Sequence, residues 1–286
     1  MTTYHTAKVE GLDVFYREAG DPSHPKLLVL GGFPSSSHSF RNLIPALADR
    51  FHVLCPDYPG FGNSDMPDPA MWPYTFDRLA EIVEGLLSAV GFTGPMGIYM
   101  HDYGGPIASR ITEKHPDWLQ WQVIQNVNTY EEGFTPVWDG IKQFWANRNA
   151  ETEAAIDGFL GYDTVKAIYT TGHPDPGKIS PDNWNMDLYF LARPNAHQVQ
   201  IDLLYDYQKN RALYSTWQER FRTEQPKTLI VWGEGDIFIT PEGGEAYLRD
   251  LPDATMLRLN SGHFAVEDSL DEIVSAVKDF YDSKVK

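Results

Sequence analysis

Apolar runs of strand length alternate with segments of helical spacing, and this alternation constrains the fold more than any other feature of the chain. The runs expected to form buried strands lie at 26–30, 51–55, 97–100, 120–127, 228–232 and 255–259. The segments of helical spacing lie at 39–49, 75–90, 104–115, 242–251 and 270–281. A further edge strand is expected at 8–17, with a hairpin turn at 11–13. Buried strands separated by helices predict an α/β protein whose sheet is mostly parallel, with helices on both faces.

The alternation stops at Tyr130 and resumes after Gln225. Only helical patterns occur between these residues, and their expected starts are Thr135-Pro136, Asp163, Ser180-Pro181 and Asn195. An insertion at this point would lie over the carboxyl ends of the strands, where parallel sheets bind ligands. We therefore predict a core domain formed by 1–129 and 226–286, and a helical cap domain at 130–225.

The apolar run at 97–100 leads directly into His101-Asp102-Tyr103-Gly104-Gly105, where the pattern changes from strand to helix. A strand that turns sharply into a helix lifts the side chain at the turn clear of the sheet, as it does for the serine of a G-x-S-x-G elbow. Here that side chain belongs to Asp102, and a carboxylate is a nucleophile that needs no base to remove its proton. The alternative role for Asp102 is to cap the helix that follows.

Two further side chains are expected at the same edge of the sheet, because each follows a predicted strand. They are Asp236 and His263. His263, oriented by Asp236, could take a proton from the water that cleaves an ester formed on Asp102. Glu234 is an alternative orienting acid. The predicted catalytic set is therefore Asp102, Asp236 and His263.

The loop Gly31-Gly32-Phe33-Pro34 ends the first buried run, beside the predicted elbow. A loop at this place can offer the backbone N–H of Phe33, and Tyr103 offers a second N–H directly after Asp102. Such a pair would stabilise the oxyanion that forms when water attacks an aspartyl ester. An ordinary Gly-Pro turn is the alternative interpretation of this loop.

Taken together, these motifs resemble those of the α/β-hydrolase superfamily. Within that superfamily they resemble the branch with an aspartate nucleophile, which includes epoxide hydrolases and haloalkane or haloacetate dehalogenases. The order nucleophile, acid, histidine is the order found in that superfamily. The matching segments span nearly the whole chain and lie at 32–34, 57–65, 101–105, 233–236 and 262–264. Met100 departs from the glycine that usually stands two residues before the nucleophile. The resemblance implies the α/β-hydrolase fold with an inserted cap, and hydrolysis through a covalent aspartyl ester.

The resemblance also implies which cap residues bind the substrate of an epoxide hydrolase. These enzymes use two cap tyrosines to donate hydrogen bonds to the epoxide oxygen, and a phenol is a donor at neutral pH. Tyr207, in Asp206-Tyr207-Gln208-Lys209-Asn210, is one candidate, and Tyr169 is the other. Tyr162 and Tyr189 are alternatives to Tyr169.

The dehalogenases of the same branch use other groups. Haloalkane dehalogenases hold the halide with two N–H side chains, one of them a tryptophan at the position that Tyr103 occupies here. Trp138 or Trp145 of the cap could supply a halide donor instead. Haloacetate dehalogenases bind the substrate carboxylate with arginines just after the nucleophile, where this chain has only Arg110 further along the helix. A strongly negative protein is also a poor host for an anionic substrate.

Composition limits the partners that the protein can have. A net charge of −17 without basic clusters argues against nucleic acids and against acidic membranes. No apolar run is long enough to span a bilayer, the first 11 residues do not resemble a signal peptide, and Cys55 has no partner for a disulfide. We therefore expect a cytoplasmic protein. The histidines lack metal-ligand spacing and no nucleotide-binding glycine motif follows a strand, so neither a metal nor a cofactor is expected.

We thus predict a cap-bearing hydrolase that opens an epoxide, or a similar carbon electrophile, through an ester on Asp102, with water as the second substrate. The other substrate is expected to be a small apolar or weakly polar molecule, held in a pocket between cap and sheet. A haloalkane or haloacetate dehalogenase with the same triad is the alternative, and a ligand-binding protein with little turnover is a third hypothesis. The sequence is compatible with a monomer or a homodimer.

Overall fold

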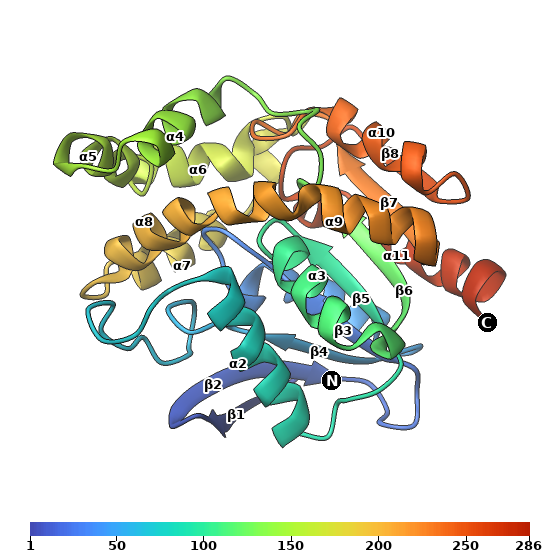
Figure 1. Cartoon of the computed structure of the whole chain (residues 1–286). Coiled ribbons are helices and arrows are strands. Elements are labelled where there is room, and N and C mark those ends of the chain that lie inside the picture. Colours follow the sequence, from blue (N-terminus) through green and yellow to red (C-terminus); the bar gives the residue numbers. More distant parts are fainter.

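A single mixed sheet forms the centre of the computed structural model, which describes residues 1–286. Its eight strands follow the order β1-β2-β4-β3-β5-β6-β7-β8 (Figure 1). Neighbouring strands from β4 to β8 are parallel, whereas β1 and β2 are antiparallel at one edge. The strands are β1 Thr3–Val9, β2 Leu12–Ala19, β3 Lys26–Leu30, β4 His52–Pro56, β5 Met96–His101, β6 Leu119–Gln125, β7 Lys227–Gly233 and β8 Thr255–Leu259. The predicted fold class is confirmed.

Two details near the start of the chain differ from the sequence prediction. The segment expected as one edge strand at 8–17 forms the antiparallel pair β1 and β2, which is longer and turns at Glu10-Gly11. The helix expected at 39–49 is instead a 3-10 turn at Ser37–Phe40 followed by the short α1. Pro45 lies inside this segment and has no backbone N–H to donate, which disfavours a longer helix.

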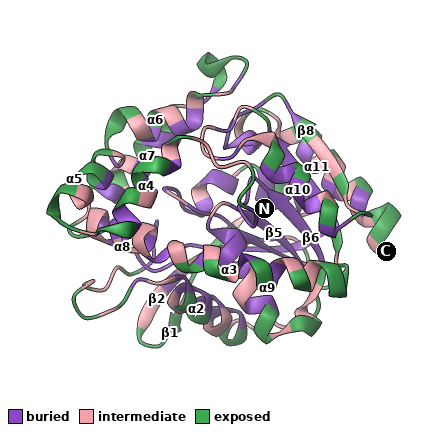
Figure 2. Cartoon of the chain, turned by 45° about the horizontal axis from the view of Figure 1, so that its top comes forward, coloured by how far each residue is buried: buried purple, intermediate pink, exposed green.

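Helices cover both faces of the sheet. Successive residues of the central strands point to opposite sides, and the apolar side chains on each side pack against helices. Helices α2, α3 and α10 pack on the face that carries Ile98 and Met100, and α1 and α11 pack on the face that carries Tyr99. Figure 2 shows buried residues on the strands and the inner sides of the helices, with exposed residues on the outside. The helices of the core are α1 Leu43–Leu47, α2 Phe76–Ala89, α3 Gly104–Lys114, α10 Pro241–Asp250 and α11 Leu270–Phe280. No helix in the protein combines the length and the apolar character needed to cross a membrane.

The segment between β6 and β7 contains helices joined by loops and no strand. Its helices are α4 Val137–Ala146, α5 Ala150–Gly158, α6 Tyr162–Thr170, α7 Asp182–Leu191, α8 Ala196–Asp206 and α9 Gln208–Glu224. In Figure 1 the helices α4 to α8 form a group at one end of the sheet, and α9 leads the chain back along the face covered by α3. The helix α5, which no sequence pattern indicated, buries only Ile156.

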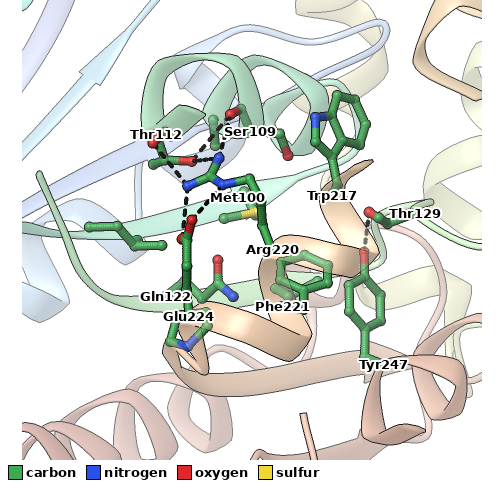
Figure 3. Close-up of a pocket in the computed structure, with 14 residues that line it drawn as sticks. Met100, Ser109, Thr112, Gln122, Thr129, Trp217, Arg220, Phe221, Glu224 and Tyr247 are labelled. Carbon is green, nitrogen blue, oxygen red and sulfur yellow. Dashed lines mark hydrogen bonds and ion pairs between the residues drawn. The ribbon is translucent and has the colours of Figure 1, made fainter. Parts of the chain in front are cut away.

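Arg220 attaches the returning helix α9 to α3. Its guanidinium donates to the carbonyl oxygen of Thr112 at 2.9 Å and pairs with Glu224 at 2.8 Å (Figure 3). Carbonyl oxygens at the C-terminal end of a helix have no partner within the helix, so a basic side chain there is stabilising. The side chain of Met100 lines the space between these helices (Figure 3) and does not line the cavity beside Asp102. A residue larger than glycine is therefore accommodated before the turn.

Candidate active site

Asp102 lies at the turn between β5 and α3, above the carboxyl end of the sheet. Its backbone has a φ angle of 51°, in the left-handed region that a residue with a side chain rarely adopts. The strained turn carries the carboxylate out of the sheet, as the sequence pattern predicts for a nucleophile elbow. The side chain of Asp102 lines the cavity described below.

His263 and Asp236 lie beside Asp102, in loops that follow β8 and β7. The Nδ1 atom of His263 is 2.7 Å from Oδ2 of Asp236, and its Nε2 atom is 3.9 Å from Oδ2 of Asp102. This Nε2 atom is buried and has no hydrogen-bond partner in the protein. The arrangement leaves Nε2 free to bind a water molecule next to the Asp102 carboxylate. Glu234, the alternative orienting acid, pairs instead with Arg258 at 3.0 Å.

Two residues that the sequence analysis missed hold this pair in place. The amide of Asn126 donates to Oδ2 of Asp236 at 2.8 Å, and its oxygen accepts from the backbone N–H of Gly233 at 2.9 Å. The Nε2 atom of His101 donates to the carbonyl oxygen of His263 at 3.0 Å. Asn126 follows β6 at the same edge as the triad and has a left-handed φ of 45°, which asparagine tolerates well. Its place at a strand end is the signal that could have identified it.

The backbone N–H of Phe33 donates to Oδ1 of Asp102 at 2.7 Å. A Cβ atom at Gly32 would clash with Oδ1 of Asp102 and with the backbone nitrogen of Tyr103, so only glycine allows this close approach. The loop after β3 therefore brings a backbone donor to the carboxylate, and Tyr103 has its N–H at the same oxygen-binding region. Since Oδ1 accepts the N–H of Phe33, Oδ2 is the oxygen left free to attack a substrate.

Burial and neighbouring charges set the protonation of the site. Burial raises the pKa of Asp102, and the charge of His263 and the N–H groups of Phe33 and Tyr103 only partly oppose this effect. Burial alone would lower the pKa of His263, but the charge and hydrogen bond of Asp236 and the charge of Asp102 outweigh this effect, so the pKa is raised above its ordinary value. His101 has a pKa well below its ordinary value because it is buried beside His263. Its ring is therefore neutral at pH 7.

A cavity of about 50 Å³ opens beside Asp102, between the edge of the sheet and the helices α4, α6 and α8. Its walls are mostly apolar, and Asp102 and Thr164 are the two lining residues that are not hydrophobic. The lining residues are Phe33, Asp102, Tyr103, Val137, Trp138, Ile141, Phe159, Thr164, Ile168, Leu204 and Phe238. Such a cavity suits an uncharged, mainly apolar ligand. The structure contains no group of three or more His, Cys, Asp or Glu side chains placed to hold a metal ion.

The predicted cap residues differ in their relation to this cavity. Tyr207 does not line it but packs against Tyr103, with the ring centroids 5.9 Å apart. Tyr169 is fully buried elsewhere, and its hydroxyl donates to Asp187 at 2.6 Å. The structure therefore does not bring Tyr169 to the cavity. The sequence around Tyr169 gave no sign that its hydroxyl would donate a hydrogen bond to Asp187.

The two candidate halide donors already have partners. The indole N–H of Trp138 donates to the carbonyl oxygen of Phe238 at 2.9 Å, although the Trp138 ring lines the cavity. The indole N–H of Trp145 donates to the carbonyl oxygen of Leu204 at 2.7 Å, and Trp145 does not line the cavity. Neither N–H group is free to bind a halide.

Comparison with known proteins identifies the family. Residues 25–270 match the family model described as the α/β hydrolase fold. The chain belongs to the α/β-hydrolase family. An uncharacterized hydrolase of Saccharomyces cerevisiae is 34% identical over 285 residues, which cover 96% of this chain and 97% of the relative.

Two relatives with named activities are less similar than the yeast hydrolase, one because its identity is lower and the other because it matches a shorter part of the chain. A haloalkane dehalogenase of Bradyrhizobium diazoefficiens is 27% identical, over 95% of this α/β-hydrolase and 91% of the relative. A soluble epoxide hydrolase of a Corynebacterium species is 38% identical over 106 residues, which cover 37% of this chain and 35% of the relative. The family and these relatives make this protein a hydrolase of the α/β-hydrolase fold.

Proposed function

We propose that this α/β-hydrolase opens a small, uncharged and mainly apolar epoxide and releases a diol. The observation that carries the proposal is the set of donors around Asp102. Tyr103 lines the cavity and the ring of Tyr207 packs against the ring of Tyr103, whereas the indole N–H groups of Trp138 and Trp145 both donate to backbone carbonyls. Phenols suit an epoxide oxygen, which must receive a proton when the ring opens.

In the first step, Oδ2 of Asp102 attacks an epoxide carbon and the carbon–oxygen bond of the ring breaks. The released oxygen takes a proton from a phenol. The product of this step is a hydroxyalkyl ester on Asp102 and a phenolate. Burial and the charge of Asp102 hold the pKa of both Tyr103 and Tyr207 above the ordinary value, so each phenol carries its proton at neutral pH. The apolar walls of the cavity favour this attack because they leave the carboxylate poorly solvated.

In the second step, His263 takes a proton from water, and the resulting hydroxide attacks the carbonyl carbon of the ester. The oxyanion that develops on Oδ1 is stabilised by the N–H of Phe33, which donates to that atom at 2.7 Å in the free enzyme. Asp236 stabilises the positive charge of His263. When the intermediate collapses, the leaving alkoxide takes a proton from His263 and the diol is released. The carboxylic acid formed on Asp102 then loses its proton, and a proton returns through solvent to the phenolate.

Haloalkane dehalogenation is a second candidate, favoured by the whole-length similarity to the haloalkane dehalogenase. The triad would act in the same way on an alkyl halide. What this candidate lacks is a pair of free N–H groups at the cavity, since both candidate tryptophans are engaged. A third candidate, a binding protein without turnover, would give no reason for the unpaired Nε2 of His263 beside Asp102.

Replacing a phenol tests which leaving group the site serves. We expect Tyr103→Phe and Tyr207→Phe each to slow ester formation from an epoxide by about tenfold to a hundredfold, because a proton donor to the leaving oxygen is lost. Ester formation from an alkyl halide, which needs no proton, should change little in either variant. The measurement is the single-turnover rate with neutral epoxides and 1-haloalkanes of similar size. Tyr169→Phe is the control, because its phenol donates to Asp187 and its ring lies in a different hydrophobic cluster from Tyr103 and Tyr207.

An unchanged epoxide rate in both variants would overturn the proposed role of the phenols. A variant that slowed both kinds of substrate equally would indicate a change in cavity shape instead, and would also contradict it.

The second step has a predictable pH dependence. His263 must be neutral to accept a proton, so ester hydrolysis slows as the pH falls through the pKa of His263. In the free enzyme the negative charge of Asp102 is one cause of the raised pKa, and formation of the ester removes that charge. We therefore expect the pH midpoint of ester hydrolysis to lie below the pKa of His263 in the free enzyme. Single-turnover rates across pH give the first value, and NMR titration of ¹⁵N-labelled histidine gives the second, with His263→Gln identifying the signal. Equal values, or a higher midpoint for hydrolysis, would contradict the assignment of His263 as the base.

A further inference from the structure

A short cap segment, Thr171–His173, lies against both loops that carry the histidine and the acid of the triad. We call this segment the cap strap. It follows α6, and no role in the chemistry described above requires it. A Cβ atom at Gly172 would clash with the backbone of Gly235, and a Cβ atom at Gly262 would clash with Thr171 and meet the His173 ring at 2.9 Å. The strap thus packs backbone against backbone beside the residues that immediately precede Asp236 and His263.

His173 fixes the strap to the histidine loop through a buried polar cluster. Its Nδ1 atom is 2.6 Å from Oδ2 of Asp268, and the hydroxyl of Ser261 donates to Oδ1 of Asp268 at 2.6 Å. The side chain of His173 is completely buried. The pKa of Asp268 is lowered because the hydrogen bonds of His173 and Ser261 and the charge of His173 outweigh the effect of its burial. Breaking a buried pair of this kind is costly because the remaining partner loses its hydrogen bonds.

The cluster contains a serine, a histidine and an aspartate but does not have the geometry of a second catalytic triad. The Ser261 hydroxyl lies 3.3 Å from Nδ1 of His173, the atom already paired with Asp268. A histidine that activates a serine must face it with one nitrogen and its carboxylate with the other. The Nε2 atom of His173 is buried and has no partner. The cluster therefore holds structure and does not attack a substrate.

The strap also reaches the acid loop through the same set of contacts. The backbone N–H of Gly235 donates to the carbonyl oxygen of Ser261 at 2.9 Å, and this hydrogen bond joins the two triad loops. Ser261 is also the residue whose hydroxyl lies next to Nδ1 of His173 and donates to Asp268. The distance of 2.7 Å between His263 and Asp236 depends on how these loops lie. Misplacing a catalytic group by about 1 Å can cost about a hundredfold in rate.

We propose that His173 is a positioning residue of the cap that sets the alignment of His263 with Asp236, and so acts selectively on the second half of the reaction. The proposal rests on the two-step mechanism proposed above. Ester formation needs Asp102 and the phenols, whereas the close contacts of the strap are with Gly235 and Gly262. Ester hydrolysis needs His263 and Asp236, whose loops the strap holds.

The test is a single-turnover comparison of the two steps in His173→Ala. We expect ester hydrolysis to slow by about tenfold to a hundredfold, with ester formation within about twofold of wild type, so that the ester accumulates. His173→Asn should recover most of the hydrolysis rate, because the asparagine amide can place an N–H near the position of Nδ1. His197→Ala is the matched control, because His197 also pairs through Nδ1 with an aspartate, Asp157, at 2.6 Å, but on the cap surface.

A merely structural role would lower both rates by the same fraction of unfolded protein, and the ratio between them would stay at the wild-type value in both variants. Equal slowing of both steps, or no slowing, overturns the proposal.

A second readout does not depend on the reaction. The amide hydrogen of Gly235 is hydrogen-bonded to the carbonyl oxygen of Ser261. We expect this hydrogen to exchange with solvent faster in His173→Ala than in wild type, and at the wild-type rate in His197→Ala. Unchanged exchange in His173→Ala would overturn the proposal even if no substrate were turned over. Absence of any ester on Asp102 in wild type and in His263→Gln would instead refute the proposed function, so the two failures are distinguishable.

Discussion

The Asp102→Ala variant is expected to lose turnover by about 10⁴-fold or more, because no other group can form the covalent intermediate. The neighbouring side chains offer no substitute, since His101 is neutral and bonded to the carbonyl of His263, and Tyr103 is held as a phenol. The measurement is kcat with the best substrate from a panel of neutral epoxides and haloalkanes.

The same variant should fold as well as wild type or better. Burial raises the pKa of Asp102, which means that the protein bears a cost for holding this carboxylate ionised. Thermal unfolding of the variant separates loss of chemistry from loss of fold. Asp139→Ala is the control, because Asp139 is exposed on α4. Residual activity above a few per cent in folded Asp102→Ala would exclude Asp102 as the nucleophile.

The His263→Gln variant is expected to complete the first step and stop at the ester. Glutamine cannot accept the proton of the attacking water, so hydrolysis should slow by about 10³- to 10⁴-fold, whereas Oδ2 of Asp102 can still attack. The expected result is one equivalent of adduct on the intact protein, located on the peptide that contains Asp102. An adduct of the whole epoxide mass would support epoxide opening, and an alkyl group without its halogen would support dehalogenation.

A matched control for this variant is His197→Gln, which removes an imidazole of the cap surface and should turn over normally. Full steady-state activity in His263→Gln would show that His263 is not the base. Loss of both steps together, with no adduct from a folded protein, would contradict the division of labour between Asp102 and His263.

The fold and the set of triad candidates were predictable because their signals are local. Each buried strand has its own apolar run, and in a parallel sheet the residues after the strands meet at one edge. The sequence therefore placed Asp102, Asp236 and His263 together without any information on long-range contacts. It left Asp236 and Glu234 open as acids, because they lie two residues apart in one loop, and only the fold directs Asp236 to His263 and Glu234 to Arg258.

The parts that were not predictable depend on contacts between distant segments. Helix α5 carries little apolar patterning and buries only Ile156, so it left no periodic signal. The cap tyrosines could not be ranked, because the partner of Tyr169 is Asp187, on another helix. Asn126 could have been named as a candidate from its place at a strand end, but its role as a donor to Asp236, 110 positions away in the sequence, could not be predicted. The cap strap is also of this kind, since a glycine and a histidine after a helix resemble an ordinary turn.

The central claim is that the reaction passes through an ester on Asp102, and a single turnover in H₂¹⁸O tests it most directly. Excess enzyme is mixed with one substrate of the panel, and the product and the Asp102 peptide are weighed separately. If water attacks the ester carbonyl, ¹⁸O enters the Asp102 carboxylate and the product of the first turnover contains none. If ¹⁸O appears in the product and Asp102 remains unlabelled, water attacks the substrate directly and the covalent mechanism is contradicted.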